Sequence, residues 1–312
     1  MTNVVDNAAT GPTGRLAGRE VGRIGFGAMQ LPGKGEGGVH VWGPPRDRDT
    51  ALAVLRRAIE LGANHIDTAH FYGAGVANEL IHAALHPYPA HLVLVSKVGA
   101  ERDGQGGWLP AQRPEQLRAG VDANLRSLAV ERVDVVNLRV LSNGGGAVGE
   151  LPADQRVDLA SQLAEMVALR DEGKIGAIGL SAVTIDQLRL ALPAGIACVQ
   201  NAYSVLDRSD EALLELCGEH GVAWVPFFPL GSAFPGAAKV TRHPAVAAAA
   251  TALGATPAQV GLAWLLAHDP HVLLIPGTSS LVHLAENMAT ANVHLDPETM
   301  RVLDGLAAPA GA

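Results

Sequence analysis

Short apolar runs alternate along most of the chain with segments in which apolar residues recur at spacings of three and four. The runs predict parallel strands covered on both faces, because such strands are apolar throughout instead of alternating. The spacing of three and four predicts helices with one buried face. The predicted strands are Val21–Met29, His65–Ala69, His91–Lys97, Val133–Arg139, Ile175–Ser181, Ile196–Asn201, Val222–Phe227 and His271–Pro276.

A helical segment follows each predicted strand. Asp47 or Asp49 is expected to cap the first helix and Pro114 to open the third, whereas Ala245–Ala267 holds one or two helices. A last helix, Pro297–Leu306, lies outside the repeat. Eight strand–helix units predict an α/β fold of the (β/α)8 TIM-barrel type, in one domain, with its chemistry at the carboxyl ends of the strands.

The alternative α/β architecture is an open, doubly wound sheet. That fold would require a Gly-x-Gly-x-x-Gly turn after the first strand, and Gly25-Phe26-Gly27 is followed by Ala28, Met29 and Gln30. The barrel is therefore the prediction for residues 19–312, and the polar residues 1–18 are expected to form a flexible N-terminal arm.

Composition and charge narrow the function. A formal charge of −8, spread along the 312 residues, argues against a nucleic-acid partner. No apolar run approaches the roughly 20 residues that span a bilayer, and the N-terminus lacks the pattern of a signal peptide. Cys198 and Cys217 have no metal-ligand spacing, and no metal site is expected. We expect a cytoplasmic protein with no membrane partner.

The predicted carboxyl ends of the second and third strands bring three chemically useful side chains together. Asp67 ends one strand and is followed by Tyr72, while Lys97 ends the next. A lysine ammonium in a dry pocket favours the phenolate of a nearby tyrosine and lowers its pKa from about 10. Such a tyrosine suits the protonation of a carbonyl oxygen during reduction. The alternative is structural, with Asp67 capping a helix and Tyr72 packing at the rim.

Further motifs occur in a fixed order along the chain. They are Gly27–Met29, His65–Gly73, Ser96-Lys97, Gly173–Ile175, Ile178–Ser181, Val199-Gln200, Pro229–Gly231, Ile275-Pro276 and Glu286-Asn287. In this order they resemble the aldo-keto reductase family from about Val21 to Leu306. The resemblance implies a (β/α)8 barrel that binds NAD(P)H across its mouth and reduces an aldehyde or ketone.

Carried over to this sequence, the resemblance implies that Tyr72 is the general acid, that Lys97 is its charged neighbour and that Asp67 holds Lys97. Arg139 stands where the family usually has a histidine. Three roles stay open for it: donation to the carbonyl oxygen, a further lowering of the pKa of Tyr72, or pairing with an acid to shape the pocket. The implied cofactor residues are Gly27, Ala28, Met29, Ser181, Gln200, Phe227, Phe228, Pro229, Leu230, Gly231, Ser232, Gly277, Thr278, Ser279, His283, Glu286 and Asn287.

Some positions depart from the family pattern. Ala182 replaces an asparagine, and Gly277 and His283 replace basic residues that commonly hold a 2′-phosphate. NADPH is the expected cofactor by resemblance, with NADH as the alternative.

Several segments also resemble a bacterial subgroup that includes pyridoxal reductases, in which an arginine at the position of Arg139 is normal. They are Trp42–Arg48, Val133–Arg139, Val225–Gly231 and Ile275–Ser280. The substrate is thus expected to be pyridoxal or the carbonyl of a specialised metabolite. Trp42, His70 and Trp108 are candidate substrate contacts in loops. The alternative function is a cofactor-binding regulator or sensor with weak catalysis. The sequence leaves open a monomer or a small homo-oligomer.

Overall fold

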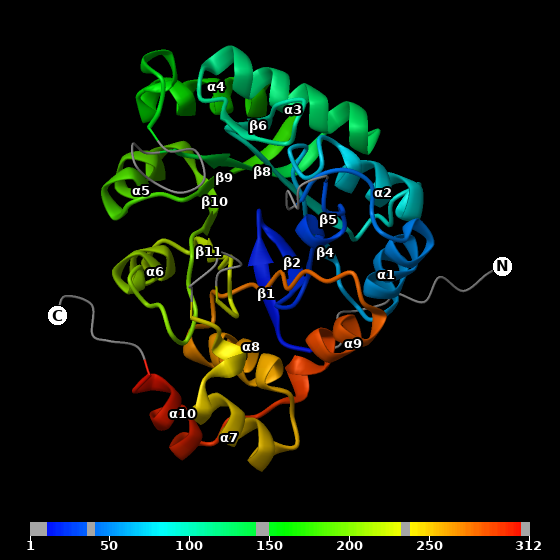
Figure 1. Cartoon of the computed structure of the whole chain (residues 1–312). Coiled ribbons are helices and arrows are strands. Elements are labelled where there is room, and N and C mark those ends of the chain that lie inside the picture. Colours follow the sequence, from blue (N-terminus) through cyan, green and yellow to red (C-terminus); the bar gives the residue numbers. More distant parts are fainter. Residues whose placement is uncertain (1–10, 36–40, 142–149, 232–237, 307–312) are drawn as a thin grey trace.

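The computed structural model describes residues 11–35, 41–141, 150–231 and 238–306. Within these ranges the main strands are parallel neighbours in one sheet of seven, in the order β11-β10-β9-β8-β5-β4-β3. Figure 1 shows this sheet curled, with helices packed around its outside. The strands are β3 (Phe26–Gly27), β4 (His65–Asp67), β5 (Val93–Val98), β8 (Val133–Arg139), β9 (Ile175–Ser181), β10 (Ile196–Gln200) and β11 (Ala223–Trp224).

The helices confirm the amphipathic segments that the spacing predicts. Asp47, rather than Asp49, caps the first helix by accepting from the backbone N–H of Thr50. Ala245–Ala267, predicted to hold one or two helices, holds two, and the first of them ends just before Gly254. The helices are α1 (Arg48–Glu60), α2 (Val76–Leu85), α3 (Pro114–Leu128), α4 (Leu159–Asp171), α5 (Ile185–Ala191), α6 (Glu211–Glu219), α7 (Pro244–Leu253), α8 (Pro257–His268), α9 (Leu281–Ala289) and α10 (Pro297–Asp304).

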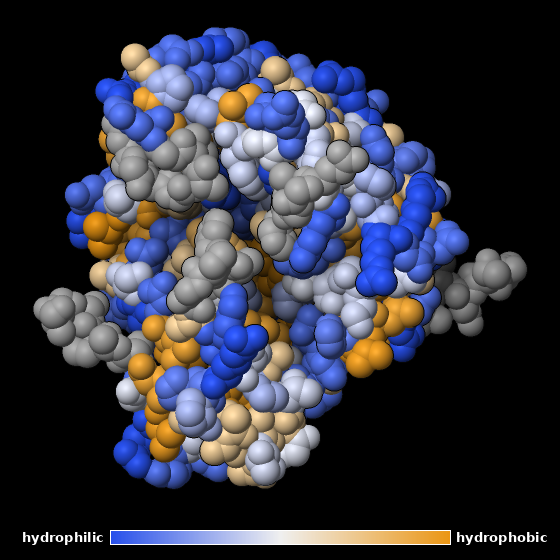
Figure 2. Space-filling model, in the orientation of Figure 1, coloured by the Kyte–Doolittle hydropathy of each residue, from blue (hydrophilic) through white to orange (hydrophobic). Residues whose placement is uncertain are grey.

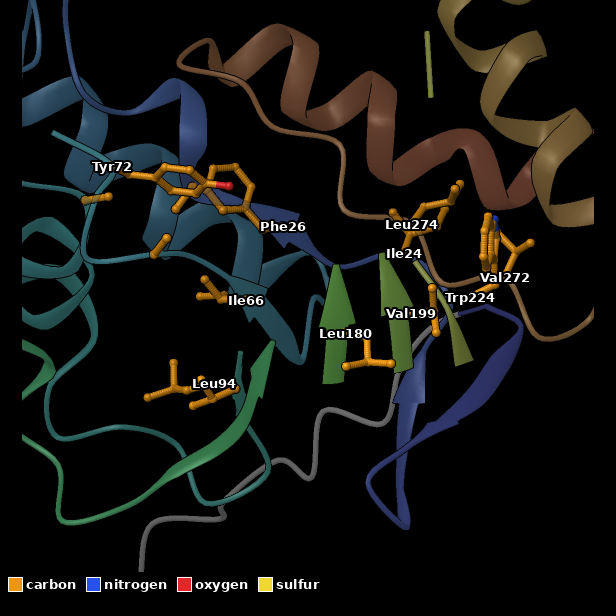
Figure 3. Close-up of a cluster of buried hydrophobic side chains, with 14 of the residues drawn as sticks. Ile24, Phe26, Ile66, Tyr72, Leu94, Leu180, Val199, Trp224, Val272 and Leu274 are labelled. Carbon is orange, nitrogen blue, oxygen red and sulfur yellow. The ribbon is translucent and has the colours of Figure 1, made fainter. Parts of the chain in front are cut away.

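Side chains of the strands β5, β8, β9, β10 and β11 enter two separate apolar clusters. Because side chains alternate across a strand, one set faces the helices and the other faces the concave side of the sheet. The outer cluster includes Ile66, Leu94, Leu180, Val199 and Trp224. Figure 3 shows these five side chains, which come from different strands. The inner cluster includes Val93, Val95, Val135, Cys198 and Ala223. The concave side is therefore filled by side chains at its base.

The segment around residues 271–275, predicted as the eighth strand, lies between the two edges of the sheet without forming a regular strand. Parallel bridges join Ile24 to Leu274 and Trp224 to Val272. The Gly25 N–H donates to Leu274 O at 2.8 Å. Regular pairing does not continue to the end of the predicted range, where Pro276 has no N–H to donate.

The first predicted strand, Val21–Met29, is wrong in its extent. Its start belongs to β2 (Arg19–Gly22), its centre contains β3, and its end is the 3-10 helix Ala28–Gln30. Strand β2 pairs antiparallel with β1 (Thr13–Leu16), which lies within the range 1–18 expected as a flexible arm; residues 1–10 of that range lie outside the described residues. The two strands are adjacent in the sequence and pair with each other as a hairpin. Leu16 and Val21 of this hairpin belong to the inner cluster.

Two other segments differ from the sequence prediction. The predicted strand Val222–Phe227 shortens to β11. A second hairpin, formed by β6 (Ala100–Arg102) and β7 (Trp108–Pro110), lies in the connection after β5, where a long loop was expected. Among the described residues no single helix is long and apolar enough to cross a membrane. Helices α7 and α8 together have the length and the apolar composition of a membrane span, but the pair is bent by 93°.

Candidate active site

Three polar side chains meet on the concave side of the sheet. Asp67 ends β4, Lys97 lies near the end of β5, and Gln200 ends β10. Asp67 accepts from Lys97 Nζ through one carboxylate oxygen and from Gln200 Nε2, at 2.7 Å, through the other. Lys97 Nζ also donates to Thr68 O at 3.1 Å. Asp67, Lys97 and Gln200 are all buried, so the ion pair is shielded from water.

Tyr72 completes this group from the loop that follows β4. Lys97 Nζ lies 5.0 Å from the centre of the Tyr72 ring, and Tyr72 is 6% exposed. Burial acts to lower the pKa of Lys97, but the charges of Asp67 and Tyr72 and hydrogen bonds to them outweigh burial, so the pKa of Lys97 is raised. The ammonium is thus held charged beside the phenol.

Arg139 ends β8 on the same face as Val135 and Asn137, by the alternation of the strand. In the sheet it is paired in register with Ser181 of β9. Burial lowers the pKa of Arg139, and interaction with Tyr72 opposes that shift. Among the described residues no carboxylate lies within ion-pair distance of the Arg139 guanidinium, so the structure provides no acid partner for it.

A cavity of about 530 Å³ adjoins Asp67, Tyr72 and Lys97. Figure 2 shows a hollow near the centre of the face drawn there, with apolar residues inside it. Most residues that the resemblance assigns to a cofactor line this cavity. They are Gly27, Met29, Gln200, Phe227, Phe228, Pro229, Leu230, Gly231, Gly277, Thr278, His283, Glu286 and Asn287.

Other predicted cofactor residues lie elsewhere. Ala28 and Ser181 are buried and do not line the cavity, and Ser279 lines a neighbouring cavity of about 780 Å³. Ser232 lies outside the described residues. The sequence interpretation also missed residues that line the cavity: Gln30, Lys239, Thr241, Thr256, Pro257 and Ala258. Thr256-Pro257 could have been predicted from the sequence, because these residues mark the start of a helix and helix N-termini bind anions.

Several buried polar atoms have no hydrogen-bond partner in the described part of the chain, and two of them lie at the carboxyl ends of the neighbouring strands β9 and β10. These two are Ser181 Oγ and Gln200 Oε1. Ser181 and Gln200 are paired in register between β9 and β10, so the two atoms belong to neighbouring positions. A buried polar atom without a partner costs free energy, and an unpaired donor and acceptor side by side suit a ligand that offers both.

The three candidate substrate contacts have different surroundings. The Trp42 ring lies against Gly106, so close that a Cβ on Gly106 would be 2.6 Å from it. His70 lines a separate cavity of about 220 Å³, and burial lowers its pKa. The Trp108 ring lies 5.4 Å from the ring of Phe71, which in turn lies 5.3 Å from that of Tyr72. None of the three lines the cavity of Tyr72.

Comparison with known proteins agrees with this fold. The model of the Aldo/keto reductase family matches residues 23–308, and the chain belongs to this family of oxidoreductases. It is 45% identical to pyridoxine 4-dehydrogenase of Escherichia coli over 292 residues, which cover 93% of this chain and 96% of that protein. An uncharacterised oxidoreductase of Schizosaccharomyces pombe is 34% identical, with 97% and 92% covered.

Solved structures are similar as well. The aldo-keto reductase of Klebsiella pneumoniae in complex with NADPH superposes with a TM-score of 0.76 at 26% identity, covering 95% of each chain.

Proposed function

We propose that the protein is an NADPH-dependent carbonyl reductase in which Tyr72 protonates the oxygen of an aldehyde or ketone. The proposal depends above all on the buried Asp67–Lys97 pair beside Tyr72 at the edge of a cavity. Membership of the aldo-keto reductase family supports it.

In this proposal each residue at the strand ends has a separate task. Tyr72 donates its proton to the carbonyl oxygen, and the Lys97 ammonium stabilises the phenolate that remains. Asp67 keeps Lys97 charged and oriented. Arg139 donates to the carbonyl oxygen, since it ends β8, interacts electrostatically with Tyr72 and has no acid partner among the described residues, although it does not line the cavity.

The residues present fit a nicotinamide cofactor. When bound, a reduced nicotinamide supplies the hydride for the carbonyl carbon. Gln200, on the cavity wall, offers its Oε1, which lacks a partner among the described residues, as an acceptor for the carboxamide. Ser181, paired in register with Gln200, does not line the cavity, and its unpartnered Oγ is proposed as the donor once the cofactor is bound. Phe227, on the cavity wall, offers an aromatic face to its ring.

The phosphate-bearing end of the cofactor would lie farther along the cavity, beside Thr278, His283 and Asn287. The start of α8 and the cation Lys239 on the same wall favour an anionic group there. The complex of the Klebsiella enzyme with NADPH supports NADPH over NADH.

The structure and its relatives also support proposals for the closure of the fold and for the substrate class. We propose that the curled sheet is closed by the segment around residues 271–275 into an eight-stranded barrel, as the bridges on both of its sides suggest. We propose that residues 19–312 form one domain. The likeness to pyridoxine 4-dehydrogenase favours pyridoxal as a substrate. No observation favours the regulatory alternative.

The test is Tyr72→Phe, assayed by NADPH oxidation with pyridoxal and other aldehydes. The variant should bind NADPH normally, because the ring is kept, and lose at least about a hundredfold in kcat, the usual contribution of a positioned acid. Tyr88→Phe is the matched control: Tyr88 donates to Leu128 O at 2.7 Å, away from the cavity, and its loss should leave turnover unchanged. Full activity of Tyr72→Phe would refute the assignment.

A further inference from the structure

Arg102, at the end of β6, binds the backbones of three separate segments beside the Tyr72 loop. Its Nε donates at 3.2 Å to the backbone O of Phe71, the residue before Tyr72. One terminal nitrogen donates to Gly106 O at 2.6 Å, in the turn of the β6–β7 hairpin. The other donates to Val41 O at 3.1 Å, in the connection before α1. A single planar guanidinium thus joins segments that are far apart in the sequence.

The same guanidinium also packs on an aromatic side chain. Its central carbon lies 3.6 Å from the centre of the Trp108 ring. Trp108 contacts Phe71 edge-on, and Phe71 contacts Tyr72 edge-on. Arg102 therefore contacts this aromatic group twice. It packs on the ring of Trp108 at one end, and it binds the backbone of Phe71 in the loop that carries Tyr72 at the other.

A backbone hydrogen bond links two of these segments directly. The Gly73 N–H donates to Val41 O at 3.0 Å, so Val41 O accepts from both Arg102 and the residue after Tyr72. Lysine cannot replace Arg102 here, because it lacks the planar fork that reaches several acceptors at fixed angles. Burial lowers the pKa of Arg102 to about 10, which still leaves the side chain charged at neutral pH.

We propose that Arg102 is a positioning residue that fixes the Tyr72 loop and the aromatic group beside it, and so sets how a carbonyl substrate meets Tyr72. The inference rests on the proposed reductase function. Arg102 is absent from the lining of the cavity that holds the proposed cofactor residues. A change at Arg102 should therefore alter the kinetic constants for the carbonyl substrate and leave those for the cofactor unchanged.

The experiment compares Arg102→Lys and Arg102→Met with Arg19→Lys. Arg19 also donates to backbone carbonyls, Ala90 O at 2.8 Å and Leu92 O at 3.3 Å, but at the amino end of β5. Both Arg102 variants should lower kcat/KM for the aldehyde by about 10- to 100-fold, because small displacements of an acid cost rate steeply. The KM for NADPH should stay within twofold of wild type. Arg19→Lys should keep both values.

Hydrogen exchange gives a readout that needs no turnover. In Arg102→Met the Gly73 amide should exchange about tenfold faster or more, because Val41 O loses its charged donor and the loop opens more often. Amides within β8 should keep their wild-type rates. Unchanged Gly73 exchange, unchanged aldehyde kinetics in both Arg102 variants, or equal losses for aldehyde and NADPH would each overturn the proposal. Inactive wild-type enzyme with fast Gly73 exchange in Arg102→Met would refute the reductase function and keep the loop assignment.

Discussion

Replacing Asp67 with asparagine removes one charge from a buried pair while keeping its shape. The side chains of Lys97 and Asp67 are 5% and 4% exposed, so the ammonium in Asp67→Asn would stay buried without its counter-charge. Breaking a buried pair in this way costs about 3–5 kcal/mol of unfolding free energy. The pKa of Lys97 should fall, because burial would then be opposed by Tyr72 without the charge of Asp67.

A second pair of the same residue types provides the control. Lys174 and Asp122 are 2.8 Å apart, with side chains 32% and 34% exposed. Exposed pairs contribute about 0–1 kcal/mol, so Asp122→Asn should be nearly neutral. The same fold, the same change of chemistry and a different burial isolate the effect of desolvation.

Urea unfolding followed by tryptophan fluorescence measures both variants, since Trp224 and Trp264 are fully buried and report the loss of the core. The double variant Asp67→Asn/Lys97→Met removes the remaining charge and should recover most of the lost stability. A cost below about 1 kcal/mol for Asp67→Asn, or a double variant less stable than the single one, would show that the pair is not desolvated as described.

Two further changes test the core. Burial lowers the pKa of His65 from 6.5 to about 4, only partly offset by the Leu274 backbone, so the unfolded chain binds a proton that the folded chain does not. Wild-type stability should fall by about 3 kcal/mol between pH 6.5 and 4, and His65→Met should remove this dependence in urea titrations. In Gly179→Ala the new Cβ would overlap Asn137 Oδ1, costing about 1–3 kcal/mol by thermal melting. Gly104→Ala, in open space, is its control.

The outcomes that contradict these two predictions are equally definite. A flat stability profile for the wild type between pH 6.5 and 4 would mean that His65 is protonated in the folded state. A Gly179→Ala protein that melts with the Gly104→Ala control would mean that Asn137 moves aside without cost.

The order of strands and helices was determined by the sequence where a segment is covered on both faces. Val133–Arg139 and Ile175–Ser181 form strands with the predicted bounds, because short segments rich in Val, Ile and Leu suit a buried parallel strand. The grouping of Asp67, Tyr72 and Lys97 was also predictable, since carboxyl ends of parallel strands meet at one edge. Local pattern and topology together sufficed for these residues.

Contacts between distant segments were decided only by the tertiary structure. Gln200 reaches Asp67 across 133 positions of sequence, and Arg102 joins the backbones of Phe71 and Val41. Neither pairing has a sequence signal, because an amide or guanidinium looks the same whether it faces solvent or a buried acceptor. Periodicity encodes which face of an element is buried, whereas the partner of a buried polar group depends on which elements pack together.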